Sequence, residues 1–234
     1  FRSLELLPDA AQPFILRALV RCVDATRDGH ALAAQVRGMY YPLIMHAAQA
    51  RFDSAAHASP VSLSSALSLW HALVDAADPS TSGAVHIHIL SQLPAMVTSV
   101  EQHLANADVQ VSAGRATLAL LRALPELQNA STLLAGSAQH VLELLRAMLT
   151  FLTDQPRVSG LDATFEDLLV LYLSLLEELV RACASSDAAE ANAPHADDLR
   201  SLCLGAFGAV MPMLKRDVLT IPSVAEAFAQ LVHV

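Results

Sequence analysis

Apolar residues between Thr164 and Ala184 recur at the spacing of a single helical face, and this pattern is the strongest constraint on the fold. Counted from Phe165, the apolar positions follow at offsets of 3, 4, 7, 10, 11, 14 and 15 residues, which places them on one side of an α-helix. Val170, Leu171 and Leu173 widen this stripe beyond what a surface helix needs. The pattern therefore predicts a helix with neighbours on more than one side.

The same periodicity predicts helices along the rest of the chain. They are expected at Asp9 to Arg27, His30 to Phe52 with a break at Pro42, Ser62 to Ala77, Gly83 to Ala105 with Pro94 inside, a helix capped by Asp108 and stopped by Pro125, Ser131 to Thr153, Thr164 to Ala184, Ala196 to Leu214, and Pro222 to Val234. Asp78 and Pro79 are read as a helix stop followed by a loop. No stretch of useful length alternates with the period of two that strands require. Ala and Leu, the best helix formers, dominate the apolar composition, so the sequence predicts an all-α chain.

Tandem helices joined by short polar segments are typical of stacked helix pairs. One pair cannot bury its apolar faces alone, so we expect an α-solenoid of antiparallel helix pairs of the HEAT type. Residues 1–234 are expected to be part of one array of about four to five repeats, and the chain is expected to be a fragment of a longer protein. A globular bundle is the alternative fold. Residues 185–197, which are small and acidic, are expected to form a flexible insert.

The charge balance limits the classes of partner. The chain of 234 residues carries 23 acidic and 14 basic side chains, a formal charge of −9, and its arginines are scattered singly. Nucleic-acid binding needs a clustered basic surface, so no nucleic-acid partner is expected. The uncharged stretch from Leu202 to Leu214 covers 13 residues, short of the roughly 20 that a membrane span needs, so no membrane insertion is expected.

The histidines suggest no metal site. His86 and His88 are two residues apart, so on a helix they point to nearly opposite sides and cannot share an ion. His140 and Glu143 can share a face, but no third ligand is spaced to join them. We interpret the ten histidines as ordinary, partly exposed side chains.

The cysteines and the absence of catalytic motifs point away from an enzyme. Cys22, Cys183 and Cys203 form no Cys-x-x-Cys pair and are interpreted as free thiols packed in helices. The sequence contains no zinc-protease, nucleophile-elbow or phosphate-loop motif. We therefore expect no catalytic residues, no cofactor and no metal.

Four acidic residues of one predicted helix are the only candidate partner-binding residues. Glu166, Asp167, Glu177 and Glu178 are interpreted first as a solvated helix edge and alternatively as a docking site for a basic protein. Elsewhere, the aromatic residues Trp70 and Tyr172 lie on apolar stripes and are expected in the core. Tyr40 and Tyr41, which precede Pro42, are expected to pack at a helix joint.

Residues 210–222 contain two prolines and a charged Lys-Arg-Asp triplet within an otherwise apolar run. Pro212 is expected to kink a helix late in its course, and Lys215 and Arg216 then fall near the helix C-terminus, where cations are favoured. Pro222 is expected to open the next helix at its first position. The stretch is therefore interpreted as a joint between two helices.

The order of residues in this joint, MetProMetLeuLysArgAspValLeuThrIlePro (211–222), resembles the joint near the C-terminal end of exportins in the importin-β (karyopherin) superfamily. Phe165 to Leu179 is similar to a helix that precedes an acidic insert in that family, and Tyr40 to Ile44 resembles the start of the preceding array. The likeness is greatest to exportin-4-like receptors, with exportin-7-like receptors next. Ile221 departs from the family pattern, which usually has an aromatic residue there.

The resemblance implies a nuclear transport receptor that shuttles between nucleus and cytoplasm. Such receptors bind Ran in its GTP form together with a protein cargo, and they contact the Phe-Gly repeats of nucleoporins. The resemblance transfers no binding residue individually, and the cargo is expected to be basic because of the acidic residues above. A cytosolic HEAT-repeat scaffold that binds proteins without Ran is the alternative function.

Overall fold

The chain folds into helices throughout the part described by the computed structural model, which covers residues 8–25, 31–154, 163–189 and 196–234. Within these ranges there are ten α-helices and three short 3-10 helices, and no strand forms. The α-helices are α1 (Gln12–Asp24), α2 (Ala31–Ala55), α3 (Pro60–Ala76), α4 (Pro79–Ser91), α5 (Leu93–Glu101), α6 (Ala107–Ala123), α7 (Ala130–Asp154), α8 (Ala163–Ala189), α9 (Ala196–Val210) and α10 (Pro222–His233). The 3-10 helices are η1 (Leu124–Glu126), η2 (Met211–Met213) and η3 (Val218–Thr220). The predicted all-α class is confirmed.

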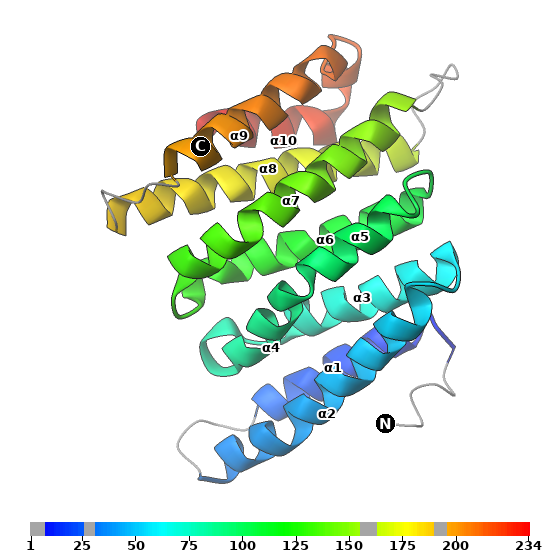
Figure 1. Ribbon diagram of the computed structural model, residues 1–234, viewed down its shortest axis with the longest axis vertical. Helices are drawn as coiled ribbons and strands as arrows, with labels where there is room; N and C mark the ends of the chain where they lie inside the picture. Colours follow the sequence, from blue (N-terminus) through cyan, green and yellow to red (C-terminus); the bar gives the residue numbers. More distant parts are fainter. Residues whose placement is uncertain (1–7, 26–30, 155–162, 190–195) are drawn as a thin grey trace.

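The helices stack in two layers (Figure 1). In the rear layer α1 contacts α3, α3 contacts α6, α6 contacts α8, and α8 contacts α10. The front layer contains α2, α4, α5, α7 and α9, and the chain passes from one layer to the other after each helix except between α4 and α5. This alternation is the arrangement expected of an α-solenoid. The division into HEAT-type repeats stays a prediction.

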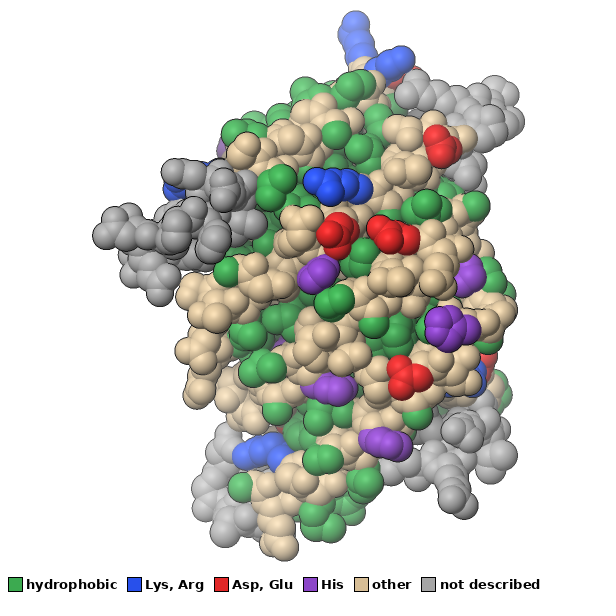
Figure 2. Space-filling model, viewed as in Figure 1, with side chains coloured by type: hydrophobic (Ala, Val, Ile, Leu, Met, Phe, Trp, Pro, Cys, Tyr) green, Lys and Arg blue, Asp and Glu red, His purple; other side chains and the backbone are tan. Residues whose placement is uncertain are grey.

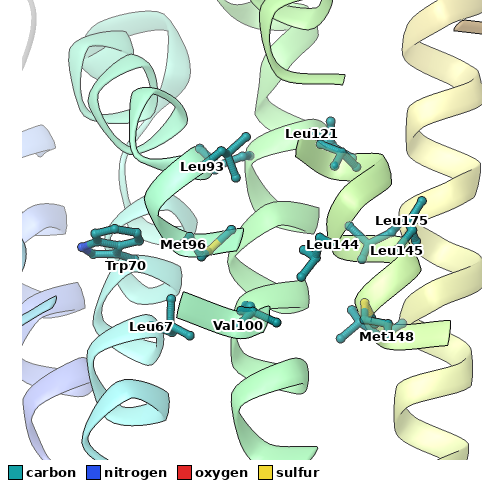
Figure 3. Close-up of a cluster of buried hydrophobic side chains, with 14 of the residues drawn as sticks. Leu67, Trp70, Leu93, Met96, Val100, Leu121, Leu144, Leu145, Met148 and Leu175 are labelled. Carbon is teal, nitrogen blue, oxygen red and sulfur yellow. The ribbon is translucent and has the colours of Figure 1, made fainter. Parts of the chain in front are cut away.

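The buried apolar residues form one continuous cluster from Leu16 in α1 to Leu231 in α10. Figure 3 shows its central part, where Trp70 of α3, Met96 of α5 and Leu144 of α7 point into the space between the layers. Tyr172 of α8 is also buried, and its hydroxyl donates to the carbonyl of Ala206 in α9 at 2.9 Å. Burial raises the pKa of Tyr172 to about 12, so the phenol stays protonated as a donor. Both aromatic residues expected in the core are confirmed there.

Two prolines behave differently from the sequence prediction. The predicted break at Pro42 is wrong, because α2 continues through it. Tyr41 and Ile44 on either side are buried in the core, and this packing offsets the roughly 3 kcal/mol cost of an interior proline. The single helix predicted around Pro94 is also wrong, because α4 ends at Ser91 and α5 begins at Leu93. Pro94 therefore lies in a first turn, where its missing N–H costs little.

Two predicted helix starts are shifted. Asn106, not Asp108, caps α6, because its side-chain oxygen accepts from the amide of Val109 at 3.1 Å. Asp78 does not begin a loop: it caps α4 by accepting from the amide of Ser80 at 2.9 Å, and Pro79 is the first helical residue. A cap and the helix stop before it look alike in sequence, because both use a short polar residue followed by proline.

The joint at residues 210–222 differs from the prediction at its first proline. α9 ends at Val210, and Pro212 lies in η2, so the predicted kink inside a longer helix is wrong. Met213 and Val218 are buried while Lys215 is exposed, so the segment packs as a short connection. Pro222 begins α10 at its first position, as predicted.

The predicted insert at residues 185–197 is partly helical. α8 continues to Ala189 and α9 begins at Ala196, so both ends of that range belong to helices. Residues 190–195 lie outside the described part of the chain. The helix expected from Thr164 begins one residue earlier, at Ala163.

Tyr41 ties three helices together through a buried polar network. Its hydroxyl donates to Asp24 at the end of α1 and lies 2.8 Å from the hydroxyl of Ser82 in α4. Ser82 is itself 2.6 Å from Asp24, and the amide of Asp78 donates to the second Asp24 oxygen at 3.0 Å. The prediction that Tyr40 and Tyr41 pack at a helix joint is right for the contacts of Tyr41, although it lies inside α2, and wrong for Tyr40, whose side chain is 44% exposed.

We expect Tyr41→Phe to lower the free energy of unfolding by about 1–2 kcal/mol, since it removes a buried hydrogen-bonding hydroxyl while leaving the ring in place. Tyr40→Phe is the matched control, because the neighbouring Tyr40 side chain is exposed and its change should stay within about 0.5 kcal/mol. Urea unfolding of both variants measures the difference. Equal midpoints would show that the network adds nothing to stability.

Candidate functional site

The four acidic candidates lie along α8, which is in the rear layer between α6 and α10. Near its start, Glu166 accepts a hydrogen bond from the hydroxyl of Ser223 in α10. Asp167 is exposed, and its carboxylate lies 3.9 Å from the guanidinium of Arg115 in α6. This end of α8 therefore presents one exposed carboxylate with a basic neighbour.

The other two candidates are not on a solvated edge. Glu177 and Glu178 are only 5% and 9% exposed. Arg181 bonds to both, at 2.9 Å for Glu178, and Nε of Arg122 in α6 donates to Glu178 at 3.2 Å. The charge of Glu178, more than that of Glu177, raises the pKa of Arg181. The interpretation as a solvated edge is wrong for this pair, because both side chains are nearly buried, both pair with Arg181 of α8, and Glu178 also pairs with Arg122 of α6.

A groove of about 470 Å³ lies in the rear layer beside this cluster. It is bordered by α3, α4, α6 and η1, and its polar lining residues are His71, Asp75, His86, Arg115, Arg122 and Glu126. Sequence reasoning did not select these residues as a group. The spacing of these residues in the sequence could have indicated the group. His71 and Asp75 are four residues apart on α3, and Arg115 and Arg122 are seven apart on α6, so each pair shares one face of its helix.

The charges of the groove are balanced by pairing between neighbouring helices. Asp75 lies 3.2 Å from Nε of Arg17 in α1, and Arg122 pairs with Glu178. The partly buried ring of His71 has a lowered pKa, caused first by burial and then by the charge of Arg17. The groove therefore presents both acidic and basic side chains, and Asp75, Arg115 and Arg122 among them are already paired with charges on neighbouring helices.

His86 lies beneath this groove and is fully buried. Neither ring nitrogen has a hydrogen-bond partner of normal geometry, although the carbonyls of Val74 and Ser82 lie near enough to favour the protonated ring. Burial outweighs those carbonyls and lowers the pKa of His86. The interpretation of the histidines as partly exposed is wrong here. His86 is buried because it lies on an apolar face of α4 together with Val85, Ile89 and Leu90.

The buried neutral state of His86 makes stability depend on pH. An unfolded histidine takes up its proton below a pH of about 6.5, whereas the folded protein resists protonation, so stability falls as pH drops below that value. We expect His86→Leu to weaken this loss between neutral and mildly acidic pH, measured as the change in urea midpoint. His46→Leu, at an exposed position, serves as control. Identical pH dependence in both variants and the wild type would contradict the assignment.

The remaining histidines do not assemble a metal site in the described residues. Nδ1 of His140 lies 3.0 Å from a carboxylate oxygen of Glu143, one turn away on α7. The hydrogen bond from Gln139, and then that from His140, lowers the pKa of Glu143. Among residues whose placement is described, no group of three or more histidine, cysteine or acidic side chains could hold an ion.

A second groove of about 290 Å³ opens between α7, α8 and α9. Its lining is mainly apolar and includes Leu142, Leu145, Leu149, Leu202 and Ala206, together with Arg146.

Figure 2 shows the face formed by the front layer, where the basic side chains of the described residues do not gather into a stripe. None of the helices described in the structure has the length and apolar character required to cross a bilayer.

Comparison of the chain with known protein families, curated protein sequences and solved structures finds no match in any of the three.

Proposed function

We propose that the chain is a protein-binding helical array and, within that class, part of a nuclear transport receptor similar to exportin-4-like receptors. The observation that carries the proposal is the order of residues in the joint Met211–Pro222, together with the helix that precedes it at Phe165 to Leu179. The stacked two-layer arrangement is compatible with it, because such arrays expose long surfaces for docking.

A receptor of this kind would bind Ran in its GTP form together with a protein cargo in the nucleus. Hydrolysis of GTP would release the cargo in the cytoplasm, and the receptor would shuttle between the two compartments. The formal charge of −9 favours a basic partner. Exposed Asp167 and the neighbouring rear-layer groove are the places that we propose for such a contact.

Passage through the pore would require contact with Phe-Gly repeats of nucleoporins. The apolar groove between α7 and α9 is the place that we propose for a phenylalanine side chain, because Leu149 and Leu202 line it and remain partly exposed. An aromatic side chain seated there would be removed from water on most of its surface.

A binding assay with Ran tests the proposal. The complete natural polypeptide is immobilised and presented with Ran loaded with either GDP or a non-hydrolysable GTP analogue. We expect selective retention of the GTP form, strengthened by cargo. Equal or absent retention of the two forms by a folded protein would overturn the transport assignment. Retention of basic proteins without any effect of Ran would favour the cytosolic scaffold instead.

A further inference from the structure

Two of the three cysteines meet where α8 packs against α9. Cys183 lies in the last third of α8 and Cys203 in α9, and both are buried, at 8% and 5% exposure. Their thiols are hydrogen-bonded to each other, and the two helices are in direct contact. Cys22 is exposed on α1.

We propose that Cys183 and Cys203 form a reversible disulfide that fastens α8 to α9 when the protein meets a peroxide. The neighbouring thiols already lie within hydrogen-bonding reach, and a disulfide needs Cα atoms of the two residues within about 7 Å. The two residues lie on helices that are in direct contact, and a cross-link in folded protein requires their Cα atoms to come within that distance. The inference is independent of the transport proposal.

The reaction balances with one peroxide for each disulfide. The Cys183 sulfur attacks one peroxide oxygen, the O–O bond breaks, and the first water leaves while Cys183 becomes a sulfenic acid. The Cys203 sulfur then attacks that sulfur, the S–O bond breaks, and the second water leaves with the Cys203 proton. Two S–H bonds are thus replaced by one S–S bond, and the peroxide takes up two electrons and two protons.

The surroundings determine which oxidants can reach the two sulfurs. The hydrogen bond to Cys183, and then burial, strongly raise the pKa of the Cys203 thiol. The order of attack does not change the product, because either sulfur attacking the peroxide first gives the same disulfide. Because both sulfurs are buried, a small peroxide should reach them, whereas a bulky disulfide such as oxidised glutathione should react mainly at Cys22.

Cross-linking would close a loop of about 20 residues and should raise the thermal midpoint by about 5–10 °C, an increase that a thiol reductant reverses. The experiment treats folded Cys22→Ser protein with hydrogen peroxide, blocks remaining thiols under denaturing conditions, and maps the cysteine peptides by mass spectrometry without reduction. We expect one peptide pair joined through residues 183 and 203 in monomeric protein.

A second variant separates cross-linking from simple oxidation. With Cys22→Ser and Cys203→Ala combined, Cys183 should be oxidised to the sulfenic acid or beyond, and the thermal midpoint should not rise. The proposal is overturned if the peroxide-treated Cys22→Ser protein contains both thiols free, both separately over-oxidised, or a cross-link between two chains.

Discussion

We expect Trp70→Ala to lower the free energy of unfolding by about 3–5 kcal/mol. The Trp70 side chain is only 1% exposed, and its ring stacks on that of Phe52 in α2, with centroids 4.1 Å apart and planes 28° from parallel. Truncation would remove this contact and leave a large cavity between α2 and α3. Because the site is enclosed by helices of both layers, the surroundings can close it only in part.

Phe14→Ala is the control for this change. Phe14 is also aromatic and also in a rear-layer helix, but its side chain is 69% exposed, so its loss should change stability by no more than about 0.5 kcal/mol. Trp70 is the only tryptophan, so unfolding in urea must be followed by far-ultraviolet circular dichroism and not by fluorescence. Similar midpoints for the two variants would contradict the position of Trp70 in the core.

The periodicity of apolar residues was sufficient to predict which parts of the chain are helical, although α4 and α5 were expected to be one helix. Each predicted helical region contains a helix in the described structure, because burial of a continuous stripe determines where a helix can pack. Residue spacing also placed Trp70 and Tyr172 in the core correctly. These predictions succeeded because they depend on residues close together in the chain.

The prolines show where local reasoning failed. Pro42, Pro94 and Pro212 look alike in sequence, yet the first lies inside a helix, the second in a first turn and the third in a 3-10 helix. The difference comes from tertiary packing. At Pro42 the buried neighbours Tyr41 and Ile44 hold the helix together, and the sequence alone does not reveal how strongly they are anchored.

The candidate site was predicted less well than the fold. Glu177 and Glu178 appeared to be surface residues because charged side chains are seldom buried without a partner. The partner from another helix is Arg122, 56 residues from Glu178 in the chain, and nothing in the local pattern identifies it. The contact between Cys183 and Cys203 was missed for the same reason, since it depends on how α8 and α9 pack.

The close approach of α6 and α8 leads to the second large effect. Gly114 lies inside α6, where an added Cβ would lie 2.6 Å from Cδ2 and 3.0 Å from Cγ of Leu171 in α8. Leu171 is itself only 7% exposed, so it cannot move away into solvent. We expect Gly114→Val to lower the free energy of unfolding by about 2–3 kcal/mol, since overpacking forces side chains off their rotamers or separates the helices.

Gly136→Val is the matched control for this variant. Gly136 also lies inside a helix, α7, but nothing is within 4 Å of an added Cβ there. Both variants replace glycine by valine inside a helix, so the change in helix propensity is the same for the two. Because no atom is in the way at position 136, Gly136→Val should stay within about 0.5 kcal/mol of the wild type. Equal urea midpoints for Gly114→Val and Gly136→Val would show that α6 and α8 are not as close as described.

Removing the obstacle should restore part of the lost stability. Leu171→Ala alone should cost about 2–5 kcal/mol by leaving a cavity, but in the Gly114→Val background the new methyl groups occupy some of that space. The double variant should therefore be less destabilised than the sum of the two single changes, by more than about 0.5 kcal/mol. Strict additivity would mean that residues 114 and 171 are not in contact, and the packing of α6 against α8 in the rear layer would then need revision.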